Sequence, residues 1–194
     1  MKKIYLVVLV LLIGCSSDSV DSSDETPVII ETGLKDLATS KGKFIGNLMR
    51  DGFFDNHDIY NGAIDNILKT EYNALVTGNK LKMVNLLRDR PEDPFNIKIS
   101  DLNTYNIDRF VNYANKHNMK KRGHVMIWYK QIPNWLDEES KTWTSQQIYD
   151  FTESYIRALS RYTNGKIDEW DVLNEAIVFN GYRLSLIHIS EPTR

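Results

Sequence analysis

The stretch that decides the fold runs Ile167-Asp168-Glu169-Trp170-Asp171-Val172-Leu173-Asn174-Glu175-Ala176. It follows a turn signal, Asn164-Gly165, and its apolar residues predict a short buried strand that ends near Leu173. A polar pair, Asn174 and Glu175, stands where this strand stops. A glutamate at the carboxyl end of a parallel strand is well placed to hold a proton over a bound molecule. On this pattern alone, Glu175 is explained equally well as the cap of a following helix or as a residue that faces solvent.

Strand-like and helix-like segments alternate before this stretch. Apolar residues predict strands at 43–48, 72–76 and 125–128. Helical spacing of apolar residues predicts helices at 59–68, at 104–118 and after a capping box at 144–147. This regular alternation favours parallel βα units over a sandwich or a helical bundle. Within such a sheet we expect Ile45, Leu75, Ile127 and Val172 to face the inner side.

The first residues have the pattern of a secretory leader. Lys2 and Lys3 precede an apolar run, residues 4–13, that is too short to span a bilayer. Leu12-Ile13-Gly14-Cys15 resembles the lipobox of bacterial lipoproteins, in which cleavage exposes the cysteine for lipid attachment. Cys15 is the only cysteine, and a lone cysteine is otherwise a small buried hydrophobe. We therefore expect a leader at 1–14 and a secreted lipoprotein, anchored through Cys15 at the outer membrane or cell surface of a Gram-negative bacterium.

Composition separates a tether from a folded domain. Residues 15–35 are rich in Ser, Asp, Glu and Thr, and such a segment buries too little apolar surface to offset its chain entropy. This acidic tether resembles the surface-export signals of some lipoproteins, although it also serves as a plain spacer. The 194 residues are 42% hydrophobic with a net charge of -2, which suits a globular domain from residue 36 onward. The charge gives no basic excess that would indicate a nucleic-acid partner.

Polar motifs follow the second, third and fourth expected strands. Residues 71–83 are similar to Glu-Phe-Asn-Ser-Val-Thr-Pro-Glu-Asn-Glu-Met-Lys-Trp. Residues 122–135 are similar to Arg-Gly-His-Thr-Leu-Val-Trp-His-Ser-Gln-Thr-Pro-Asp-Trp, and the opening stretch contains a close match to Trp-Asp-Val-Val-Asn-Glu-Ala. These three sequences are motifs of glycoside hydrolase family 10, the barrel-fold xylanases. The resemblance implies an α/β fold, the N-terminal half of a (β/α)8 TIM barrel, at residues 36–183.

The resemblance also implies roles for individual residues. Glu175 falls on the acid/base, and Asn174 falls on the position that contacts the 2-hydroxyl of the sugar. The other substrate-binding positions are Asn79 and Lys82 in the glycone subsites, and His124, Trp128 and Gln131 beside the cleaved bond. Taken alone, Lys82 is also explained as a solvated lysine at a helix start, and His124 as a hydrogen-bonded core residue.

The chain departs from the family pattern at three places. Gly78 stands where the family usually has Glu, Met83 where it has Trp, and Tyr129 where it has a second His. These departures change the outer subsites and one corner of the site.

The implied reaction is hydrolysis of xylan or xylo-oligosaccharides with retention, by an endo-1,4-β-xylanase that needs no metal or cofactor. Retention needs a second carboxyl group about 5–5.5 Å from the first. The family's nucleophile motif, on the seventh strand, has no counterpart in this chain, and Asp168, Glu169 and Asp171 lie too near Glu175 on the same strand to replace it. The chain is therefore expected to be an inactive piece of a xylanase. The alternative is a catalytically inactive glycan-binding lipoprotein with the same fold.

The last residues, 184–194, depart from every motif of that family. Leu184-Ser185-Leu186-Ile187-His188-Ile189-Ser190-Glu191-Pro192-Thr193-Arg194 resembles the translation of a transposase adapter used in sequencing libraries. We expect this segment to be non-native and assign no function to it.

Overall fold

A computed structural model describes residues 33–54 and 60–175. The chain divides into two units, 1–31 and 32–194, and all described residues belong to the second unit. Cys15, the leader expected at 1–14 and the segment 184–194 lie outside the described residues. None of the described helices is long and apolar enough to cross a membrane.

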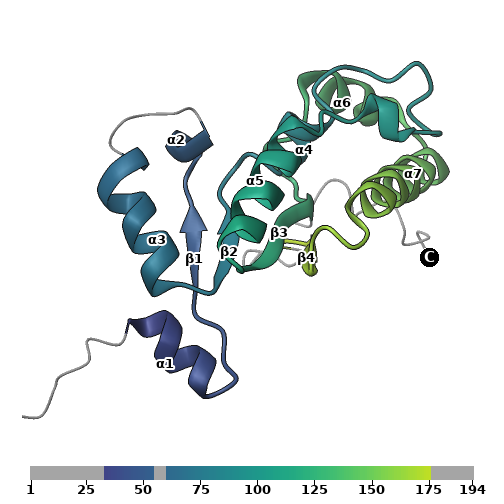
Figure 1. Ribbon diagram of the computed structural model, residues 1–194. Helices are drawn as coiled ribbons and strands as arrows, with labels where there is room; N and C mark the ends of the chain where they lie inside the picture. The colour runs from purple at the N-terminus through teal and green to yellow at the C-terminus, as the bar shows by residue number, and fades with distance from the viewer. Residues whose placement is uncertain (1–32, 55–59, 176–194) are drawn as a thin grey trace, which may run out of the picture. The chain divides into compact units, whose positions relative to one another are not determined.

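Four parallel strands form one sheet in the order β1-β2-β3-β4 (Figure 1). The strands are β1 (Gly46–Met49), β2 (Ala74–Thr77), β3 (Lys120–Ile127) and β4 (Glu169–Leu173). Each strand pairs with the next one along the chain, and the register shifts between His124 and Ile127 of β3. This sheet confirms the predicted α/β class, and its strand order is that of a partial barrel.

Helices precede and connect the strands. They are α1 (Leu34–Ser40), α2 (Asp51–Phe54), η1 (Tyr60–Ile64), α3 (Asp65–Glu71), α4 (Met83–Leu86), η2 (Ile99–Asp101), α5 (Tyr105–Lys116), α6 (Asn134–Glu139), η3 (Ser140–Thr142) and α7 (Ser145–Thr163). Several of these helices, among them α3, α5 and α7, pack against one face of the sheet. The predicted capping box is confirmed at α7, where the Thr144 N–H donates to Gln147 Oε1 at 2.9 Å and Thr144 Oγ1 accepts from the Gln147 N–H at 3.3 Å. Helix α1 begins at Leu34, inside the range 15–35 that we assigned to the tether.

The core lies between the sheet and these helices. Leu75 of β2, Phe110 of α5 and Phe151 of α7 are each at most 1% exposed and belong to one apolar cluster. The prediction that Leu75 and Ile127 face the inner side of the sheet is therefore wrong, because both are buried in this core. An offset of one residue moves a side chain to the other face of a strand, and the apolar pattern alone did not fix that offset.

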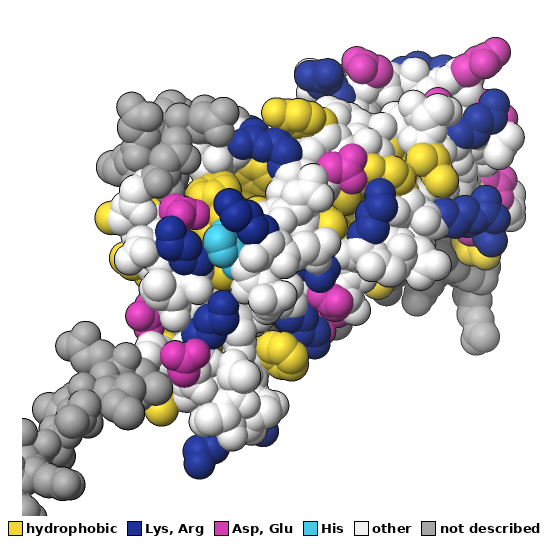
Figure 2. Space-filling view, viewed as in Figure 1, with side chains coloured by type: hydrophobic (Ala, Val, Ile, Leu, Met, Phe, Trp, Pro, Cys, Tyr) yellow, Lys and Arg dark blue, Asp and Glu magenta, His cyan; other side chains and the backbone are white. Residues whose placement is uncertain are grey.

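The opposite face of the sheet is open and polar. Its residues are Leu48 of β1, Val76 of β2, Arg122 and His124 of β3 and Asp171 of β4, and all of them line one cavity. Figure 2 shows the other side of the molecule, on which α5 lies, and there Lys and Arg side chains are interspersed with Asp and Glu side chains. That side therefore carries charges of both signs rather than a patch of a single sign.

Strand β4 is an edge strand. Among the described residues it pairs only with β3, and Val172 and Leu173 are 50% and 46% exposed. The prediction of a buried strand is therefore wrong for the end of this stretch. Trp170 is half-buried against Gly123, where an added Cβ atom would lie 2.4 Å from the indole ring.

Candidate functional site

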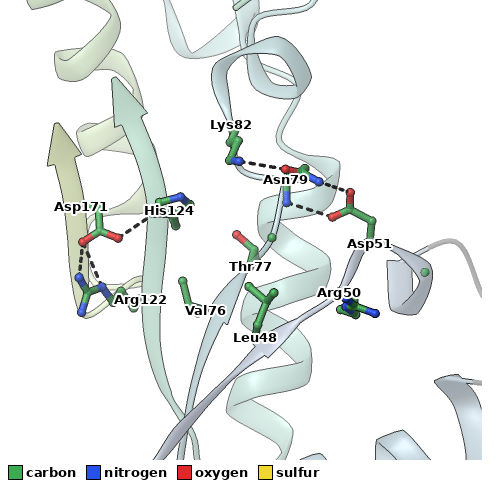
Figure 3. Close-up of a pocket in the computed structure, with 12 residues that line it drawn as sticks. Leu48, Arg50, Asp51, Val76, Thr77, Asn79, Lys82, Arg122, His124 and Asp171 are labelled. Atoms are coloured by element: carbon green, nitrogen blue, oxygen red, sulfur yellow. Dashed lines mark hydrogen bonds and ion pairs between the residues drawn. The ribbon is translucent and has the colours of Figure 1, made fainter. Parts of the chain in front are cut away.

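Polar side chains gather at the carboxyl ends of the strands. They line a cavity of about 720 Å³ that includes Asp51, Asn79, Lys82, His124 and Asp171 (Figure 3). Since the strands are parallel, side chains that follow β1, β2, β3 and β4 meet at the same edge of the sheet. This edge is where open and closed α/β sheets place their ligand sites.

Lys82 is the centre of a hydrogen-bond network. Its Nζ donates to Asn79 Oδ1 at 2.9 Å and to Gln131 Oε1 at 2.6 Å, and it lies 4.3 Å from the centroid of the Trp128 ring. The residue is only 8% exposed, so it is not a solvated surface lysine. Burial lowers the pKa of the Lys82 ammonium, while the carboxylates of Asp51 and Glu175 act to raise it.

Trp128 connects this network to Glu175. The Trp128 Nε1–H group donates to Glu175 Oε2 at 2.9 Å, so the carboxylate is held at the end of the neighbouring strand. Glu175 and Gln131 have backbone φ angles of 51° and 52°, a left-handed conformation that is uncommon for residues other than glycine. Such conformations cluster at binding and active sites, where the surrounding structure holds them in place.

Asn174 completes the end of β4. Its backbone N–H donates to the Ile127 carbonyl at 3.0 Å, which extends the pairing of β3 and β4 to the last residue before Glu175. The Asn174 side chain is half-buried. This bond fixes the backbone from which Glu175 projects.

His124 belongs to a second polar group on the open face. Asp171 lies opposite His124 in the strand register, and its Oδ2 atom is 2.9 Å from His124 Nδ1. Arg122 donates to Asp171 Oδ1 from Nε at 3.1 Å and also from Nη2. Burial acts to raise the pKa of Asp171, but hydrogen bonds from Arg122 and His124 outweigh it and hold this pKa below its ordinary value. His124 is thus a hydrogen-bonded residue with its ring in the cavity.

The structure brings the predicted site residues together. Hydrogen bonds and ring contacts connect one network of five: Asn79, Lys82, Gln131, Trp128 and Glu175. His124 shares the cavity with Asn79 and Lys82, and Asn174 sits beside Glu175. No three His, Cys, Asp or Glu side chains of the described residues form a metal site.

Sequence reasoning missed two acidic residues of this site. Asp51 accepts hydrogen bonds from the Asn79 backbone N–H at 3.0 Å and from Asn79 Nδ2 at 2.8 Å. It follows β1 by two residues, so the same search at strand ends would have found it. Asp171 was considered only as a second catalytic carboxyl group, and strict alternation along β4 would have placed it on the cavity side.

Comparisons with known proteins agree with this arrangement. The family model described as Glycosyl hydrolase family 10 matches residues 33–189, and thus extends past Arg183, where we expected native sequence to end. The chain is 28% identical over 182 residues to endo-1,4-beta-xylanase B of Thermotoga neapolitana. That alignment covers 92% of this chain and 46% of the relative.

Solved structures show the same fold. Xylanase 10B from Thermotoga maritima superposes with a TM-score of 0.69 at 24% identity, over 80% of this chain and 44% of that one. Xylanase 10B from Thermotoga petrophila, in complex with xylobiose, gives a TM-score of 0.65 at 24% identity, over 78% of this chain and 42% of that one. The chain spans less than half the length of each of these three proteins. Its motifs, its parallel sheet and the match over residues 33–189 show that the chain belongs to glycoside hydrolase family 10.

Proposed function

We propose that the chain is the glycone side of a retaining endo-1,4-β-xylanase, with xylan and xylo-oligosaccharides as its substrates. The observation that carries this proposal is the Lys82–Trp128–Glu175 arrangement, in which a buried cation, an indole and a carboxylate meet at one edge of the sheet. Relatives named endo-1,4-beta-xylanase and a relative bound to xylobiose support the choice of sugar.

The chemistry of the network suits a sugar ligand. A xylose unit presents hydroxyl groups around its rim and C–H groups on its ring faces. Lys82 has three N–H donors, of which Asn79 and Gln131 take two, so one is left for a ligand hydroxyl. The half-buried Trp128 offers an apolar ring, and the Nε1–H of the same ring orients Glu175.

Glu175 acts as the acid/base in this proposal. It protonates the oxygen of the leaving sugar and later takes a proton from the attacking water. Asp168, just before β4, and the two acidic residues of β4 each form an ion pair with β3. Asp168 pairs with Lys121 at 3.2 Å, Glu169 with Lys120 at 3.3 Å, and Asp171 with Arg122 and His124. None of these three supplies the second carboxyl group that retention requires. We therefore propose that the chain binds xylo-oligosaccharides without turnover. The alternative function, that of an inactive glycan-binding lipoprotein, predicts the same behaviour.

Release of reducing sugar from xylan tests this proposal, with Glu175→Gln as the matched control. We expect the purified chain and the control to be equally inactive, and both to bind xylotriose in a calorimeter. Turnover by the chain above that of Glu175→Gln would contradict the missing-carboxyl argument.

In a protein that includes a second carboxyl group, Glu175→Ala should lower hydrolysis of xylan by about 10²–10⁴-fold. Aryl xylosides with good leaving groups should keep a fast first step, and an equal loss on both substrates would contradict the acid role.

We also propose that Cys15 carries a lipid anchor. The lipobox-like stretch 12–15 supports this placement. Metabolic labelling with a fatty acid should mark the chain and should fail for Cys15→Ser, and equal labelling of both proteins would contradict the proposal.

A further inference from the structure

The space beside Gly78 is occupied by the carboxylate of Asp51. A Cβ atom added at Gly78 would lie 3.3 Å from Asp51 Oδ1, and its next neighbours, Met49 O and Leu48 Cδ1, would lie 3.8 and 3.9 Å away. Gly78 is the position at which the family resemblance leads us to expect a Glu. We propose that Asp51 supplies, from the end of β1, the carboxylate that position 78 lacks, and that it is a positioning residue for Asn79 and Lys82. This inference rests on the proposed function, because it assigns Asp51 to the saccharide site.

Asp51 determines which way the Asn79 side chain points. An ionised carboxylate only accepts hydrogen bonds, so the end of the amide that faces Asp51 must be the NH₂ group. The observed bonds agree: Asp51 accepts from the Asn79 backbone N–H and from Asn79 Nδ2 (Figure 3). The Asn79 Oδ1 atom is then left to face Lys82, 2.9 Å away. A flipped amide would place NH₂ against the ammonium and an oxygen against the carboxylate.

The orientation of Asn79 in turn fixes Lys82. Asn79 Oδ1 and Gln131 Oε1 bind two of the three N–H donors, and the ring of Trp128 lies 4.3 Å from Nζ. The third donor is therefore held in one direction instead of being free to rotate. Preorganising a donor in this way lowers the entropy lost when a ligand binds.

The charge of Asp51 also favours the ammonium form of Lys82. Burial disfavours this ammonium, and Asp51 and Glu175 are the two carboxylates that offset the effect of burial on its pKa. Without the Asp51 carboxylate, Lys82 would lose both a fixed hydrogen-bond acceptor and a nearby opposite charge.

Exchange of the carboxylate between positions 51 and 78 tests the inference in the full 194-residue chain. The variants are Asp51→Asn, Asp51→Ala, Gly78→Glu and the double variant Asp51→Ala/Gly78→Glu, with xylotriose as the probe in calorimetry. Asp51→Asn and Asp51→Ala should each weaken binding about tenfold, the effect of one charge-assisted hydrogen bond. Gly78→Glu should also weaken binding, because two carboxylates would compete for one place. The affinity of the double variant should return to within about threefold of the wild-type value, because the effects of substitutions at two contacting sites are not additive. Asp137→Asn, on α6, removes an exposed carboxylate outside the cavity lining and serves as the matched control that should change nothing.

Nuclear magnetic resonance adds a readout that needs no ligand. In Asp51→Asn the pKa of Lys82 should fall further, and the side-chain amide of Asn79 should exchange its protons faster. Unchanged Lys82 and Asn79 resonances would overturn the inference, as would a double variant that binds no better than Asp51→Ala. If the wild-type chain binds no xylotriose, the proposed function is contradicted, and the two resonances still decide whether Asp51 positions Asn79 and Lys82. Asp51→Asn preserves the shape of the side chain, so the test does not depend on the bolder variants folding.

Discussion

Substitution of Lys82 by Met should separate binding from stability. One of the three Lys82 N–H donors is left for a ligand, so the change removes one charge-assisted hydrogen bond to the sugar. Such a bond contributes about 1.5–3 kcal/mol, which corresponds to a loss of affinity of about 10- to 150-fold. Stability should respond differently, because the pKa of Lys82 is lowered in the folded protein. At neutral pH the folded state therefore disfavours this charge relative to the unfolded chain, and removing the charge relieves that penalty.

The substitution also leaves two oxygen atoms without their donor. Gln131 is exposed and Asn79 is half-buried, so water can reach both atoms. We therefore expect the free energy of unfolding to change by less than about 1 kcal/mol. Calorimetry with xylotriose measures the affinity, and urea unfolding followed by tryptophan fluorescence measures the stability. Lys141→Met is the control, since the acidic partners of Lys141 among the described residues, Asp137 and Glu138, lie on the surface of α6. Unchanged affinity, or a large loss of stability, would refute this reasoning.

Three further predictions concern the scaffold. Gly123→Ala should destabilise the protein by about 1–3 kcal/mol, because the added methyl group would lie 2.4 Å from the Trp170 ring. In a thermal melt, the double variant with Trp170→Leu should recover part of the lost stability. Tyr155→Phe should leave the free energy of unfolding in urea unchanged or raise it, since the buried Tyr155 hydroxyl has no partner among the described residues. Tyr113→Phe should lower that free energy, because it loses the 2.8 Å hydrogen bond to Asp65. A larger loss of stability for Tyr155→Phe than for Tyr113→Phe would contradict both assignments. The chain should self-associate through the outer edges of β1 and β4, where Leu48 and Val172 are 44% and 50% exposed. Light scattering should show that Val172→Lys is more monomeric than wild type. A wild-type chain that is monomeric at high concentration would show that these edges do not pair.

The parts of the fold that the sequence predicted depend on local patterns. The capping box at Thr144 and the apolar stripe of α5 are set by residues three or four positions apart, so a single segment contains all the information. The polar residues at strand ends were predicted because the alternation of strands and helices implies a parallel sheet, whose strands end together. The assignment of Glu175, Lys82 and Gln131 to one site came from the resemblance of their motifs to those of glycoside hydrolase family 10, and not from this alternation.

The parts that could not be predicted depend on what lies across space. Val172 and Leu173 have the composition of a buried strand, but burial requires a neighbour on the far side of β4, and among the described residues there is none. Asp51 was missed because polar residues were sought only after the second, third and fourth expected strands, although Asp51 follows β1 by two residues. The absence of a side chain at Gly78 becomes informative only when the Asp51 carboxylate is seen beside it.

The most direct measurement of the proposed site is a titration of the ¹⁵N-labelled chain with xylotriose, followed by nuclear magnetic resonance. We expect saturable shifts of the Trp128 indole and of the Asn79 and Gln131 side-chain amides, because these groups surround Lys82 at the carboxyl end of the sheet. Resonances around Phe44, before β1, and Lys120, at the start of β3, should stay in place, because both lie at the amino end of the sheet. Shifts confined to that opposite end, or no shift at Trp128, Asn79 and Gln131, would contradict a saccharide site built on Lys82 and Glu175.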